Sequence, residues 1–157
     1  MGRRLGDFVE LELSPQPQMF FLVRMIAASI ASFVRFEPGQ VEDLRLAVDE
    51  LLLTLTPEAH GYKRAENTLR VEFQWHVDLI EVSATLLCGT TVRDGVGSRE
   101  TPGPDDGVAR TEEDPDARTR LAISRSILEA VVDEYGTSSA GEAPRAWLRV
   151  ARRAVQD

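Results

Sequence analysis

Several features that would place this chain outside the cell or in a membrane are scarce or missing. It has a single cysteine, Cys88, so no disulfide can form within it, and this favours a reducing compartment. No apolar run approaches the roughly 20 residues that a membrane-spanning helix needs. The opening residues are polar and lack the apolar core of a signal peptide. We therefore expect a cytoplasmic protein with no membrane contact.

Positive charge and metal-ligating side chains are also in short supply. Lysine and arginine number 18 against 26 aspartate and glutamate residues, which gives a net charge of −8. Such a chain is poorly suited to direct binding of nucleic acid, whose phosphates attract basic surfaces. The charge suits a basic protein partner, or it serves only solubility. The two histidines, His60 and His76, have no cysteine or carboxylate at ligand spacing, so we expect no metal site.

What the chain does have is patterned hydrophobicity. Hydrophobic residues make up 43% and charged residues 28% of its 157 residues, a balance typical of one globular domain, here residues 1–157. Alternating apolar residues predict strands at 8–13, 69–76, 80–86 and 147–155, the second and third forming an antiparallel hairpin, with a short extra strand near Thr137. Helical spacing predicts helices at 19–33, 41–55 and 121–135. We expect Trp75 and Trp147 in the core.

Residues 93–117 differ in kind, because they are acidic, rich in glycine and proline, and free of aromatic residues. Such a segment buries too little apolar surface to offset the entropy of ordering it, so we expect a mobile loop. A turn is expected at 37–39 and a turn-rich connector at 136–144. The element order predicts an α+β fold, a two-layer α/β sandwich in which helices cover one face of a mixed, mostly antiparallel sheet.

Two segments carry a resemblance to a known family. The helix sequence of residues 41–50, Val-Glu-Asp-Leu-Arg-Leu-Ala-Val-Asp-Glu, resembles the first nucleotide motif of the GHKL ATPases, a histidine-kinase-like fold. The closest likeness is to the small anti-sigma-factor serine kinases of the RsbW type, and among them to degenerate actinobacterial members. Leu22-Val23-Arg24, in an apolar entry helix, is the second point of similarity. The resemblance covers residues 8–155 and implies a GHKL-type sandwich and a homodimer.

The family's nucleotide motifs match this sequence only in part. In working members the helix carries Glu-x-x-x-Asn on one face, where the carboxylate acts as base and the amide oxygen holds Mg²⁺. Glu50 matches the carboxylate, but Thr54 replaces the asparagine. Of the later Asp-x-Gly only Gly89 remains, and the Gly-x-Gly at the start of the last helix corresponds to the glycine-free residues 121–124. The resemblance implies a pseudokinase with Glu50 as a relic base, Glu50, Thr54 and Gly89 as cofactor-binding candidates, and no bound ATP or magnesium.

The resemblance also implies partners. It predicts an anti-sigma factor of the stress-response type, which sequesters an alternative sigma factor and is countered by a STAS-domain anti-anti-sigma protein. Arg24 matches the family's partner-binding arginine and is equally read as a solvated residue on the outer edge of its helix. Asp43 and Arg45 are read first as a surface charge pattern and second as partner-binding candidates. Two alternatives stay open. One is a divergent, active ATP-dependent serine kinase in which Thr54 holds Mg²⁺; the other is a GHKL-fold regulator that binds a different signalling protein.

The first helix is more apolar than one buried stripe requires. The excess comes from Phe20, Phe21, Met25, Ile26 and Ile30. It predicts either a dimer or partner face, or a helix covered on all sides.

Overall fold

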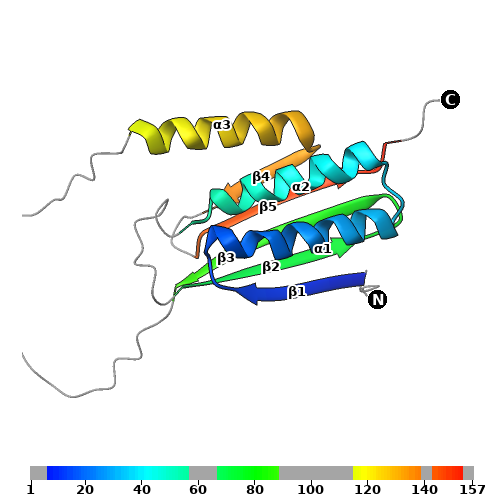
Figure 1. Cartoon of the computed structure of the whole chain (residues 1–157), viewed down its shortest axis with the longest axis horizontal. Helices are drawn as coiled ribbons and strands as arrows, with labels where there is room; N and C mark the ends of the chain where they lie inside the picture. The colour runs from blue at the N-terminus through cyan, green and yellow to red at the C-terminus, as the bar shows by residue number, and fades with distance from the viewer. Residues whose placement is uncertain (1–6, 57–66, 89–114, 139–142, 154–157) are drawn as a thin grey trace, which may run out of the picture.

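The computed structural model describes residues 7–56, 67–88, 115–138 and 143–153 (Figure 1). Within them the elements follow in the order β1 (Asp7–Leu13), the 3-10 turn η1 (Pro17–Met19), α1 (Phe20–Phe33), α2 (Pro38–Leu53), β2 (Asn67–Trp75), β3 (Leu79–Cys88), α3 (Pro115–Val131), β4 (Glu134–Ser138) and β5 (Arg145–Ala151). This order confirms the predicted succession of strands and helices. The short strand expected near Thr137 is β4.

The strands form one sheet in the order β1-β2-β3-β5-β4, and every neighbouring pair is antiparallel. The predicted hairpin is β2–β3, in which Val71 lies opposite Ala84. The expectation of a mixed sheet is wrong for the described strands. Strands β3 and β4 do run in the same direction, but β5 lies between them, so no two parallel strands are neighbours.

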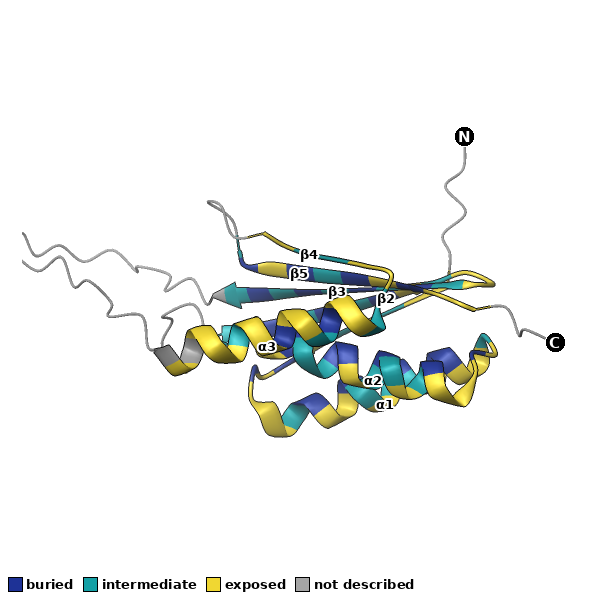
Figure 2. Cartoon of the chain, turned by 90° about the horizontal axis from the view of Figure 1, so that it is seen from above, coloured by how far each residue is buried: buried dark blue, intermediate teal, exposed yellow. Residues whose placement is uncertain are grey.

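All three α-helices lie against the same face of this sheet (Figure 2). Because successive strand side chains point to opposite faces, every second residue of the inner strands is buried against the helices. These core residues are Leu69, Val71 and Phe73 of β2, Ile80, Val82, Ala84 and Leu86 of β3, and Ala146, Leu148 and Val150 of β5. The α+β sandwich with helices on one face is therefore confirmed.

The junction between α1 and α2 is set by its local sequence. After α1 ends, Arg35 has a φ of 61°, and the Phe36 N–H donates to the Ala31 carbonyl at 2.9 Å. This is a left-handed helix cap, a place usually taken by glycine. Helix α2 begins with Pro38 after the extended Glu37, as expected for a proline in a first helical turn. The turn predicted at 37–39 is thus the start of α2.

The predicted boundaries of the third helix are wrong at both ends. Helix α3 starts at Pro115, so the last three residues of the predicted loop 93–117 are helical, while residues 89–114 lie outside the described part. The helix ends at Val131. Tyr135, which was expected on this helix, lies in β4, where it pairs with Leu148 of β5. The change occurs at Asp133, whose N–H donates to the Arg149 carbonyl of β5. Strand β4 also takes residues 136–138 from the predicted connector.

The two tryptophans occupy different faces of the sheet. Trp75 packs against the core, as predicted. Trp147 does not, because its neighbours Ala146 and Leu148 are the residues of β5 that face the helices. It lies on the open face, the sheet surface opposite the helices, so its assignment to the core is wrong.

Candidate functional site

Helix α2 lies between α1 and α3, and two consecutive acidic residues connect it to both. Successive residues of an α-helix are about 100° apart around the axis. Asp49 therefore turns toward α1, where it meets Arg24, and Glu50 turns toward α3, where it meets Ser124. The segment that carries the family resemblance is thus the centre of the helical layer.

The contact between α1 and α2 is an ion pair. Arg24 Nη1 donates to Asp49 Oδ1 at 2.6 Å, and each side chain is 32% exposed. A single contact of this kind leaves the remaining N–H groups of the guanidinium available, and pairs in contact with water contribute little stability. Arg24 is therefore held in position at the surface while keeping donors for another acceptor.

The two other predicted partner-binding residues do not join Arg24. Arg45 Nη1 contacts both carboxylate oxygens of Glu42, at 2.8 and 3.1 Å, within α2 itself. Asp43 lies two turns before Glu50 and so on the side toward α3, and its side chain has no hydrogen bond or ion pair to the described residues. The structure brings Arg45 and Asp49 to the same side of α2, one turn apart, and leaves Asp43 on the other.

The contact between α2 and α3 engages the predicted relic base. Ser124 Oγ donates to Glu50 Oε2 at 2.5 Å, and Ser124 is 6% exposed. Sequence reasoning missed this partner. One signal could have found it, because Ser124 falls between Leu121 and Leu128 at helical spacing, on the side of α3 where only apolar residues are expected.

Thr54, the residue in the place of the family's asparagine, is the C-cap of α2. Its hydroxyl donates to the Leu51 carbonyl of its own helix at 2.6 Å. Among the described residues, no group of three or more His, Cys, Asp or Glu side chains is arranged to hold a metal ion. Gly89, the last cofactor-binding candidate, lies outside the described residues.

Residues 121–124 were expected at the start of the last helix, where backbone amides would face a phosphate. The structure corrects this, because α3 begins six residues earlier, at Pro115. Residues 121–124 are interior to the helix, where the N–H groups bond to carbonyls of the preceding turn. They cannot form a phosphate cradle in this conformation.

The outward side of the helical layer carries exposed residues on all three helices (Figure 2), and several of them are large and hydrophobic. We call this surface the helical face, and its exposed large hydrophobic residues are Phe21, Leu22, Met25 and Phe33 of α1, Leu46 and Leu53 of α2, and Ile123 of α3. The apolar residues that α1 has beyond one buried stripe have different environments. Phe20 and Ile30 are buried, whereas Phe21 and Met25 are exposed. Arg24 lies beside this apolar surface. In the part of the chain that the structure describes, no helix is both long and apolar enough to cross a membrane.

Comparison with known proteins finds partial relatives. The chain is 28% identical over 82 residues to the serine-protein kinase RsbW of Bacillus licheniformis, which covers 51% of this chain and 50% of that protein. It is 27% identical over 78 residues to the serine-protein kinase RsbW of Bacillus subtilis, covering 49% and 48%. The similarity supports an RsbW-like relationship.

The matched region has clear limits. No protein-family profile matches the chain, and the chain spans about half the length of the curated relatives it matches. The described structure is an α+β sandwich with a five-stranded antiparallel sheet, and the RsbW-like relationship implies a GHKL-type fold for it.

Proposed function

We propose that this protein is an anti-sigma-factor-type regulator that binds its partner through the helical face and no longer phosphorylates it. The RsbW-like relationship supports the class. The observation that carries the proposal is the Ser124–Glu50 hydrogen bond of 2.5 Å. It engages the carboxylate that a kinase of this type would need to orient or deprotonate a hydroxyl.

The partners follow from the same proposal. An alternative sigma factor docks on the helical face, and a STAS-domain protein competes for an overlapping surface. Exposed apolar residues beside an arginine suit such an interface, because aromatic and arginine side chains supply most of the binding energy at protein contacts. The protein acts in the cytoplasm as a homodimer, without direct contact to nucleic acid or membrane.

Loss of nucleotide binding is the second part of the proposal. Thr54 offers a hydroxyl, which is shorter and a weaker Mg²⁺ ligand than the amide oxygen of the family's asparagine,. The interior position of residues 121–124 in α3 supports the same conclusion. Regulation then comes from partner levels or from another kinase.

Copurification tests the class. The tagged protein is recovered from its own cells, the copurifying proteins are identified by mass spectrometry, and the candidate partner is then titrated in purified form. Direct binding of an alternative sigma factor is the expected result. If another regulator binds and no sigma factor does, the proposed fold still holds, but the sigma factor is not the partner of this protein.

An active serine kinase is the competing function, favoured by the names of the relatives and by the presence of Glu50. Calorimetry with Mg-ATP separates the two, with Glu50→Gln as the matched control. We expect no binding by either protein at millimolar nucleotide. Tight binding by the unmodified protein that Glu50→Gln changes, together with phosphate transfer to the recovered antagonist, would establish the kinase instead.

A further inference from the structure

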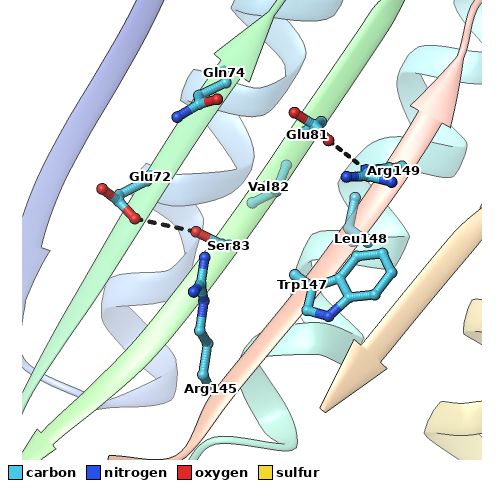
Figure 3. A pocket seen from close by; sticks show the side chains of 9 residues that line it. All are labelled: Glu72, Gln74, Glu81, Val82, Ser83, Arg145, Trp147, Leu148 and Arg149. Carbon is cyan, nitrogen blue, oxygen red and sulfur yellow. Dashed lines mark hydrogen bonds and ion pairs between the residues drawn. The ribbon is translucent and has the colours of Figure 1, made fainter. Parts of the chain in front are cut away.

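The open face of the sheet carries a hollow of about 330 Å³, far from the helical face (Figure 3). It lies across β2, β3 and β5 and is lined by Glu72, Gln74, Glu81, Val82, Ser83, Arg145, Trp147, Leu148 and Arg149. None of these residues belongs to the candidate site described above. The inference drawn from the hollow therefore stands independently of the proposed function.

The hollow exists because Trp147 leans away from it. On β5, Trp147 lies between Ser83 of β3 and Gly136 of β4. A Cβ atom added to Gly136 would come within 2.7 Å of the indole nitrogen, so the ring occupies the space that the missing side chain leaves. Figure 3 shows Trp147 on the β4 side of its own strand. The small Ser83 then forms an open floor with the indole as one wall.

One arginine of the hollow is already neutralised. Arg149 contacts Glu81 and, at 3.1 Å, Glu134, and hydrogen bonds from its guanidinium to these carboxylates raise the pKa of Arg149. Its Cζ atom also lies 5.4 Å from the centroid of the Trp147 ring. These contacts hold the indole and the guanidinium in place and leave little of this charge for a ligand.

Two other charges of the hollow form no close ion pair with the described residues. The Glu72 carboxylate accepts a 3.2 Å hydrogen bond from Ser83, and Arg70 interacts with it only at longer range because Arg70 is paired with Glu12. Arg145 is exposed and has no acidic partner in the part of the chain that the structure describes. From strand spacing of about 4.8 Å and a rise of about 3.3 Å per residue, their Cα atoms are about 12 Å apart. In Figure 3 the Arg145 side chain extends from β5 toward Ser83 of β3, which narrows this gap.

We infer that the hollow binds a zwitterion of amino-acid size, whose carboxylate pairs with Arg145, whose ammonium group pairs with Glu72, and whose side chain packs against Trp147. The lining residues carry two acidic and two basic side chains, so the hollow has no net charge. A ligand with one charge would satisfy Glu72 or Arg145 and meet the other as an unpaired like charge. A dipolar ligand satisfies both.

Trp147 provides a direct readout, because the chain has only two tryptophans. In a Trp75→Phe protein, Trp147 is the sole indole. L-Phenylalanine is titrated to about 10 mM while the fluorescence of Trp147 is followed. We expect a saturable change. 3-Phenylpropionate, which lacks the ammonium group, and 2-phenylethylamine, which lacks the carboxylate, should bind at least about tenfold more weakly. Should Trp75→Phe fail to fold, the indole N–H signal of Trp147 in the ¹⁵N spectrum of the unmodified protein gives the same measurement.

Matched variants locate the site. Glu72→Gln and Arg145→Gln should each weaken binding at least about tenfold. Glu10→Gln on the same face and Arg152→Gln beyond the end of β5 should leave it unchanged. The inference is overturned if L-phenylalanine gives no change, if the singly charged analogues bind equally well, or if the controls lose binding too. Binding of charged polypeptides without any response to amino acids would also overturn it, and would mark a protein-docking surface. None of these outcomes bears on recovery of a sigma factor.

Discussion

Asp49 and Glu50 are adjacent in the sequence, yet they hold different helices: Asp49 pairs with Arg24 of α1, and Glu50 accepts a hydrogen bond from Ser124 of α3. The two contacts lie on the segment of the chain that most resembles a nucleotide motif. Their chemistry differs, because the first is a surface ion pair and the second involves a buried hydroxyl. They therefore predict different consequences of mutation.

Arg24→Ala should weaken binding of the recovered sigma factor by about tenfold or more, because an arginine beside exposed apolar residues is a typical interface anchor. The melting temperature should hardly change, since an ion pair this exposed contributes at most about 1 kcal/mol. Titration calorimetry and thermal denaturation measure the two effects. Arg125→Ala, an exposed arginine on α3, is the control. Unchanged affinity in Arg24→Ala would remove Arg24 from the interface.

Ser124→Ala should lower the free energy of unfolding by about 1–2 kcal/mol, because Glu50 loses the donor that compensates its partial burial. Denaturant unfolding measures this. Ser126→Ala is the matched control, since Ser126 is exposed on the same helix and its hydroxyl donates only to the Ala122 carbonyl of that helix. Equal stability of the two variants would show that the Ser124–Glu50 contact contributes nothing to the helical layer.

Gln40→Ala should destabilise the fold by about 1–3 kcal/mol. Gln40 is buried at the start of α2, where its Nε2 donates to the Ala151 carbonyl at 3.1 Å and its Oε1 accepts from the Arg153 N–H at 3.2 Å. Without the amide, both backbone groups at the end of β5 lose their partner. Gln18→Ala, an exposed glutamine in η1, is the control, and a similar stability of the two variants in chemical denaturation would contradict the prediction.

Arg35→Gly should stabilise the protein by about 0.5–1 kcal/mol, because only glycine adopts a φ of 61° without a steric cost,. Arg35→Ala keeps the Cβ atom and should give no such gain. Comparing Arg35→Gly with Arg35→Ala by thermal denaturation separates the effect of backbone strain at this position from the effect of losing the arginine side chain. A destabilised Arg35→Gly would mean that the side chain contributes more than its backbone strain costs.

Gly136→Ala should destabilise the fold by about 1–3 kcal/mol and shift the fluorescence of Trp147, since the new methyl group displaces the indole,. Combining it with Trp147→Val should cost less than the sum of the two single changes. Gly39→Ala is the matched control, because nothing lies within 4 Å of its added Cβ. If Gly136→Ala were as harmless as Gly39→Ala, the close packing of Trp147 on β4 would be refuted.

The sequence by itself determined the elements whose pattern is local. The spacing of apolar residues predicts which side chains are buried, because it shows which residues share one face of a strand or helix. Examples are the alternation at Val71 and Phe73 and the helical spacing at Leu44, Val48 and Leu51. The helical layer and the hairpin could be predicted on this basis. The RsbW-like likeness of residues 41–50, and with it the choice of Glu50, came instead from the resemblance of that segment to a family motif.

Only the tertiary structure decided what those residues meet. The spacing of apolar residues cannot tell whether Tyr135 continues a helix or belongs to a strand. The chain passes from helix to strand at Asp133, where the backbone N–H donates to the carbonyl of the distant Arg149. Nor can the spacing show that Ser124 pairs with Glu50, 74 residues away, or that Gly136 makes room for Trp147 on the open face. These are choices between packing partners far apart in the chain, and their free energies exist only once the sheet and helices have come together.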